Sequence, residues 1–189
     1  MSILVYTESW DGSFRKSTFE AASYASETAK LLGTEVVAIS LGEVSNNELN
    51  KLGNYGVSKV VSYSAIKKGD SQAATNAIAK TANDSSILIF SNTNTAKMIA
   101  PRLSAKLKAG IVSNVITLSE SASPLKVKRQ AFSSKAIELA TVNTATAILA
   151  IAPNSYKLIE TGGNCTIEED SSNEKGAITI EGKETASGK

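Results

Sequence analysis

Histidine is absent from the 189 residues, and cysteine occurs once, at Cys165. Without imidazole, the chain has no histidine-ligated metal site and no Ser-His or Cys-His nucleophile. A single cysteine excludes an internal disulfide framework and fits a reducing compartment. We expect neither a catalytic residue nor a metal site, and we expect Cys165 to lie in a loop beside Gly162 and Gly163.

Aromatic residues, excess charge and long apolar runs are also scarce. Aromatics make up 5% of the chain, and 20 Lys and Arg against 18 Asp and Glu give a net charge of +2. This composition favours neither a nucleic-acid surface nor a membrane surface. No apolar run approaches the roughly 20 residues of a membrane span, and the first residues resemble a strand rather than a leader. We therefore expect a cytoplasmic protein without membrane insertion.

Glycine-rich phosphate loops are missing after the first predicted strand. A dinucleotide or P-loop site there needs backbone amides free of side chains. The chain instead continues through Trp10, Asp11 and Gly12, which are more typical of a tight turn than of a ligand loop.

Short β-branched runs alternate with helix-period segments up to about residue 110, a pattern of βαβ units. Strands are predicted at residues 3–7, 35–41, 59–63, 86–91 and 111–118. With 42% apolar residues, the chain is expected to form one α/β domain over residues 1–153, with an open, mainly parallel sheet flanked by helices. This is a Rossmann-like fold class.

Helix boundaries are marked by capping boxes and glycines. Ser17 with Glu20 and Ser45 with Glu48 have the Ser-x-x-Glu form that caps a first turn. Gly33 and Gly53 are predicted helix stops. Pro101 is expected to begin or kink a helix that starts near residue 95.

The alternation of strand-type runs with helix-period segments ends at about Gly110. Apolar segments 111–118, 125–131, 136–142 and 147–152 are separated by short polar connections, which predicts antiparallel strands in the second half, with 125–131 at a solvated edge. Residues 154–189 form a polar tail, in which 177–181 has a pattern that allows a short strand.

Ligands of parallel α/β sheets gather at the carboxyl ends of the strands. Those positions are Glu8 to Trp10 and the polar segment 91–95. Four side chains there, with Arg129, are the candidate cofactor-binding residues: Ser91, Asn92, Thr93, Thr95 and Arg129. The segment has two interpretations, a phosphate loop or a self-satisfied helix cap, and the cap is favoured because Asn and Thr cap helices for local reasons. Arg102 is expected at the surface.

Two segments together carry a resemblance to a known family. They are Ala100-Pro101-Arg102-Leu103 with Ala105, Leu107, Gly110 and Ser113-Asn114, and Leu52-Gly53-Asn54-Tyr55-Gly56 ahead of Val57-Ser58-Lys59-Val60. They resemble the amino-terminal domain of the alpha subunit of electron transfer flavoprotein. Around Arg129 the likeness is looser, because Phe132 and Ser134 stand where the family has tyrosine and glycine.

The resemblance implies an adenine nucleotide alpha hydrolase-like fold and a heterodimer with a beta subunit. It also implies electron transfer from acyl-CoA or other dehydrogenases to a respiratory acceptor. FAD is held mainly by a carboxy-terminal domain that opens with Ser-Gly-Gly-Arg-Gly, and nothing after Asn154 resembles that segment. The chain is thus expected to be the scaffold and subunit-interface domain, an electron carrier subunit rather than an enzyme, with residues 154–189 leading toward a missing FAD domain.

A nucleotide at the Ser91 segment is a further option, since the related fold of the beta subunit binds AMP. In alpha subunits of the family, however, this domain is expected to be empty. The alternative is a stand-alone adenine-nucleotide-binding domain similar to universal stress proteins. Those proteins usually carry a glycine-rich loop after the fourth strand, where this chain has no glycine.

Overall fold

The computed structural model describes residues 2–119, 121, 123–182 and 184 of the chain. Its main sheet has nine strands in the order β11-β5-β4-β1-β6-β10-β7-β8-β9. In chain order these are β1 (Ser2–Tyr6), β4 (Glu35–Leu41), β5 (Lys59–Tyr63), β6 (Ser85–Ser91), β7 (Gly110–Val115), β8 (Leu125–Ala131), β9 (Ala136–Val142), β10 (Ala147–Ile151) and β11 (Thr166–Glu169). A separate small hairpin pairs β2 (Ser9–Trp10) with β3 (Ser13–Phe14).

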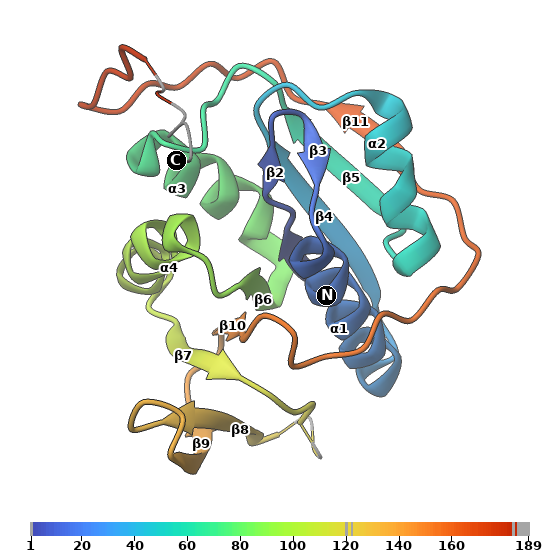
Figure 1. The fold of residues 1–189 in the computed structure, drawn as a ribbon, viewed down its shortest axis with the longest axis vertical. Coiled ribbons are helices and arrows are strands. Elements are labelled where there is room, and N and C mark those ends of the chain that lie inside the picture. The colour runs from blue at the N-terminus through green and yellow to red at the C-terminus, as the bar shows by residue number, and fades with distance from the viewer. Residues whose placement is uncertain (1, 120, 122, 183, 185–189) are drawn as a thin grey trace, which may run out of the picture.

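Helices cover both faces of the parallel part of the sheet (Figure 1). They are α1 (Lys16–Leu32), α2 (Asn46–Asn50), α3 (Ser71–Thr81) and α4 (Asn94–Leu107), with 3-10 turns η1 (Lys51–Tyr55) and η2 (Ala82–Asp84). Alternate residues of β1 enter different cores: Ile3 and Val5 pack with α1, α2 and η1, whereas Leu4 and Tyr6 pack with α3 and α4. A parallel strand buried on both faces needs such a continuous apolar run. The predicted α/β class is confirmed.

The antiparallel prediction for the second half is correct for β8, which pairs antiparallel with β7 and β9, and wrong for residues 147–152. The edge prediction for residues 125–131 is also wrong, because β8 lies between β7 and β9. β8 and β9 pair antiparallel from Leu125–Val142 to Ala131–Ala136. β10 instead lies between β6 and β7 and is parallel to both. All five of its residues are buried, so it requires a central position with a neighbour on each edge. Short connections in the sequence could not reveal this insertion.

Helix boundaries agree with the sequence patterns at two of four positions. The Ser45 side chain accepts the Glu48 amide, and Gly33 ends α1 at φ 61°, both as predicted. The predicted capping box of Ser17 with Glu20 is wrong. α1 begins at Lys16, before Ser17, and the Glu20 side chain is buried, where it accepts the Asn154 amide. The Gly53 stop is also wrong. The chain continues through η1 and turns at Gly56, where φ is 84°.

Pro101 lies inside α4 rather than at its start. The helix begins at Asn94, close to the predicted start near residue 95, and ends at Lys108 in the left-handed conformation. Its buried side is the apolar stripe that includes Ile99 and Leu103. The proline therefore occupies the middle of a continuous helix.

Residues 153–182 form a carboxy-terminal strap that runs back over the domain (Figure 1). The strap contains β11, which pairs parallel with β5 and extends the sheet by an edge strand. Sequence analysis missed β11, because three of its four residues are polar and only Ile167 packs against the core. The strand allowed at residues 177–181 is absent, and this segment instead binds the start of α3.

Buried polar groups attach the start of the strap to α1. The Asn154 amide donates to Glu20 Oε2 at 2.8 Å, and the Ile159 amide donates to Ser23 Oγ at 3.0 Å. Glu20 is only 2% exposed, so the Asn154 amide supplies an internal partner for a carboxylate removed from water. The strap is therefore bound by specific contacts along its length.

Further along, the strap binds the start of α3. Asp70 caps α3 by accepting from the Gln72 and Ala73 amides, and it also accepts the Gly176 amide. The Ala73 hydrogen bond, followed by those from Gly176 and Gln72, lowers the pKa of Asp70 although burial opposes the shift. The cap is thus also an anchor for the strap.

Gly53 is required by the strap rather than by a helix end. A Cβ at this position would lie 2.6 Å from the carbonyl carbon and 2.7 Å from the Cα of Asn164. Cys165 follows in a loop, as expected, with its Sγ 3.6 Å from the Leu49 carbonyl, and burial raises the pKa of its thiol. Glycine thus allows two backbones to approach closely.

We predict that Gly53→Ala destabilises the protein by about 1–3 kcal/mol, because the added methyl group overlaps the strap backbone. Denaturant unfolding would measure the loss, and amide exchange should rise selectively in β11. Gly182→Ala is the control, since nothing lies within 4 Å of a Cβ there. Equal stability of the two variants would contradict the close-approach argument.

Candidate ligand site at the carboxyl ends of the strands

The carboxyl ends of β1 and β6 meet at the point where the chain reverses its direction across the sheet. From β1 the chain crosses through α1 to β4, whereas from β6 it crosses through α4 on the other face toward β7. In open α/β sheets this switch point is the usual ligand crevice. It brings Glu8 together with the predicted segment 91–95.

Glu8 occupies the crevice with its own carboxylate. The side chain is 3% exposed, and Thr93 Oγ1 donates to Glu8 Oε2 at 2.6 Å. Thr93 is the N-cap of α4, and its Oγ1 accepts the Ala96 amide at 3.1 Å. The carboxylate therefore lies at a helix amino terminus, where the helix dipole favours a negative charge.

Ser91 and Asn92 of the segment are hydrogen-bonded within the protein. Ser91 Oγ donates to the Ser17 carbonyl at 2.6 Å, and the Asn92 side-chain amide donates to Asn114 Oδ1. Thr95 is half-buried in the first turn of α4. The cap interpretation is confirmed at Thr93, and phosphate binding by this segment stays a prediction.

Lys68 is a site residue that sequence analysis missed. It follows β5, and its Nζ lies 3.5 Å from Glu8 Oε1 and donates to the Ser9 carbonyl. The Lys68 Nζ and the Arg15 Cζ each lie 4.2 Å from the centroid of the Trp10 ring, within cation-π range. The available signal was its place after a parallel strand, at the same edge of the sheet as Glu8.

Trp10 belongs to the tight turn predicted from the sequence. Asp11 and Gly12 both have positive φ, 49° and 77°, between the paired residues Trp10 and Ser13. This is the two-residue hairpin geometry that Asp-Gly favours. Lys68 and Arg15 attach the hairpin beside the switch point.

The Glu8 carboxylate disfavours a phosphate at this site. The place at the α4 amino terminus where an anion would bind already holds the Glu8 carboxylate, which would repel a second anion. Burial, and to a lesser degree this carboxylate, raise the pKa of Tyr6, so the neighbouring phenol stays neutral.

Arg129 is engaged at a different part of the sheet, between β7 and β8. Its Nε donates to the Ser113 carbonyl at 2.9 Å, and Nη1 donates to Glu138 Oε2 at 2.9 Å. The Ser113 bond attaches the β8–β9 hairpin to β7, and the Glu138 bond joins the two strands of the hairpin. Arg102 is exposed on α4, as expected.

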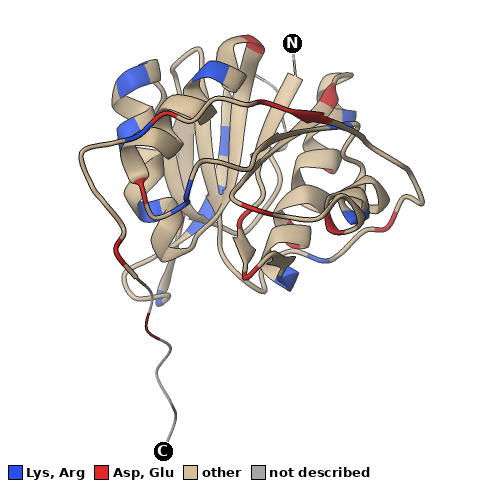
Figure 2. Cartoon of the chain, turned by 90° about the horizontal axis from the view of Figure 1, so that it is seen from above, with Lys and Arg blue, Asp and Glu red and all other residues tan. Residues whose placement is uncertain are grey.

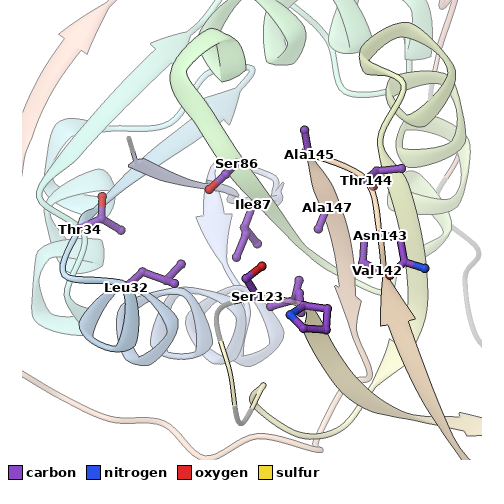
Figure 3. Close-up of a pocket in the computed structure, with 12 residues that line it drawn as sticks. Leu32, Thr34, Ser86, Ile87, Ser123, Val142, Asn143, Thr144, Ala145 and Ala147 are labelled. Carbon is purple, nitrogen blue, oxygen red and sulfur yellow. The ribbon is translucent and has the colours of Figure 1, made fainter.

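A hollow of about 550 Å³ lies at the opposite, amino ends of β6 and β10 (Figure 3). It is lined by Leu32, Thr34, Ser86, Ile87, Ser123, Pro124, Leu125, Val142, Asn143, Thr144, Ala145 and Ala147. None of these side chains is charged, so the lining offers no carboxylate or ammonium for acid-base chemistry and no cation to pair with a phosphate.

The described residues form neither a strongly charged surface nor a cluster of metal ligands. On the face shown in Figure 2, acidic and basic residues are interspersed without a continuous basic stripe. Within the described ranges, no three Cys, Asp or Glu side chains are placed to hold a metal ion. No described helix has both the length and the apolar character needed to cross a membrane.

The fold and this edge of the sheet define a doubly wound α/β domain whose switch point is closed by its own carboxylate. The family model of the electron transfer flavoprotein domain matches residues 3–178, so the chain belongs to that family. It is 30% identical over 164 residues to the electron transfer flavoprotein subunit alpha of Bacillus subtilis (strain 168). That alignment covers 84% of this chain and 49% of the relative, so the chain spans about half of its length. The resemblance predicted from the sequence is confirmed.

We predict that Glu8→Ala destabilises the fold by about 2 kcal/mol, because Lys68 and the Thr93 hydroxyl lose a buried acceptor. Glu8→Gln, which keeps an acceptor oxygen, should cost about half as much. Urea unfolding measures both. The control is Glu27→Ala, which removes a surface pair with Lys30 and should change stability by less than about 0.5 kcal/mol.

A second prediction concerns the tip of the β8–β9 hairpin. Ser134 has φ 64°. Ser134→Gly should stabilise the protein by about 1 kcal/mol, since glycine adopts this conformation without the Cβ clash. Lys135→Gly, one residue later and without positive φ, should be neutral or destabilising. Thermal unfolding of the two variants would decide, and an unstable Ser134→Gly would contradict the strain argument.

Proposed function

We propose that this chain is the amino-terminal scaffold and subunit-interface domain of an electron transfer flavoprotein alpha subunit. With a beta subunit, the complete protein passes electrons from dehydrogenases to a respiratory acceptor through FAD. In this proposal residues 1–153 form the scaffold, and residues 154–189 lead toward a carboxy-terminal domain that holds most of the FAD. The chain itself has a binding rather than a catalytic role, and the setting is the cytoplasm.

The closed switch point is the observation that carries the proposal. A doubly wound domain that bound its own nucleotide would need free amides or hydroxyls at the α4 amino terminus. Here Thr93 and Glu8 bond to each other in that place. The described residues thus support a scaffold, and family membership gives the scaffold its context.

The strap is consistent with this arrangement. Its first part is attached to α1 through Glu20 and Ser23, and its later part to the start of α3 through Asp70. A chain leaving the scaffold toward another domain would depart from a fixed point rather than from a free tail. A fixed point at which the chain leaves the scaffold limits the positions that a following domain can take.

Ligand titration separates the scaffold from the stand-alone nucleotide-binding alternative. We expect isothermal titration of the purified chain with AMP, ATP or FAD to give no saturable binding at concentrations up to about 1 mM. Mixing the chain with the electron transfer flavoprotein beta subunit of the same organism should give a complex in size-exclusion chromatography. Micromolar ATP or AMP binding without complex formation would support the alternative and contradict the scaffold.

A further inference from the structure

One part of the sheet is left uncovered on the side that α3 and α4 occupy elsewhere. Among the described residues, the core on that side ends at Ile148 and Ala150 of β10 and contains no residue of β7, β8 or β9. Figure 1 shows the β8–β9 hairpin projecting from the body with no helix beside it. The sheet therefore presents a bare face at this end.

Strand register identifies the residues of this face. Ile111 is paired with Ile148 of the α3–α4 core, so both point to the same side. On the hairpin, Val127 enters the opposite core, so the alternate residues of β8 and their direct partners on β9 point to the bare side. We call these residues the open sheet face: Ile111, Lys126, Lys128, Gln130, Ile137, Leu139 and Thr141.

The open sheet face combines large apolar side chains with unpaired positive charge. Ile137 is 67% exposed, Leu139 61% and Ile111 41%. Lys126 and Lys128 are exposed between them and form no ion pair within the described residues. The nearby Glu138 is on the other side, paired with Arg129. Adjacent exposed apolar residues of this kind indicate an interaction surface.

The hairpin also presents an exposed aromatic side chain at its tip. Phe132 is 80% exposed, and Phe132, Ser133 and Ser134 are all left-handed, with φ of 49°, 52° and 64°. Strained backbone of this type clusters at functional positions. β9 is moreover the terminal strand, with an unpaired edge in the described sheet.

We propose that the open sheet face is the docking surface for the beta subunit, whose contacting patch is apolar and edged with acidic residues. Ile137 and Leu139 would form the buried centre, while Lys126 and Lys128 would pair with carboxylates at the rim. This assignment rests on the proposed function and specifies where the subunits meet. The charge of the face selects an acidic partner over a second copy of the same basic face.

The test compares matched exposed leucines. Leu139→Gln should weaken binding of the same organism's beta subunit by about tenfold or more, as for a central interface residue. Leu31→Gln is the control, because Leu31 has the same 61% exposure but lies on α1. It should change the Kd by less than about twofold. Circular dichroism and thermal unfolding check that both variants are folded.

Charge reversal tests the rim separately. The double variant Lys126→Glu with Lys128→Glu should slow association by about tenfold at low salt, with a smaller effect at high salt. Lys97→Glu, at an exposed lysine on α4, is its control.

The outcomes are distinguishable. Equal Kd values for Leu139→Gln and Leu31→Gln, with wild-type binding intact, would overturn the surface assignment but leave the proposed function standing. Failure of the wild-type chain to bind the beta subunit would overturn both. A wild-type homodimer in sedimentation that Leu139→Gln dissociates would assign the face to a second copy instead.

Discussion

The hydrogen bond between Thr93 and Glu8 joins the two halves of this domain at their meeting point. One partner follows β1, the first strand of the half built on α1, and the other caps α4 of the second half. The bond places an internal anion where a doubly wound fold ordinarily receives an external one. The carboxylate that accepts the hydroxyl of the Thr93 cap also occupies the crevice, so the contact that joins the two halves also disfavours an external anion.

Lys68 and the Trp10 hairpin depend on that carboxylate. Once Glu8 is buried, it needs a positive partner, and Lys68 supplies it at 3.5 Å from the loop after β5. The same ammonium lies over Trp10, so the hairpin is fixed by a charge that the buried acid requires. Sequence reasoning identified the Glu8 position and the turn at Asp11, because both depend on local residue types. It missed Lys68, because that partner lies 60 positions away in the chain.

Elements with a strong local period were predictable, and elements fixed by distant partners were not. The strands β1, β4, β5 and β6 follow from short apolar runs in the sequence. The direction of β10 was predicted wrongly because an apolar strand fits an antiparallel or a parallel position equally well. Its neighbours β6 and β7, which lie far away in the sequence or on its other edge, decide the direction. β11 was missed since its strand state comes from pairing with β5 rather than from its own polar sequence.

Gly53 illustrates how a correct residue can be assigned the wrong reason. Its lack of a side chain is typical of a helix stop, and the true stop lies three residues later at Gly56. What Gly53 permits is the passage of Asn164, which no local pattern records.

The same logic applies to the other end of the sheet. The strap covers the β5 edge, where β11 adds a strand, and no described element does so for β9. The sheet ends on one side in β11, a short and mostly polar strand, and on the other in β9, where exposed Ile137 and Leu139 lie beside unpaired lysines, which is unlike a surface adapted only to water. This difference between the two ends supports the proposed docking of the beta subunit on the open sheet face.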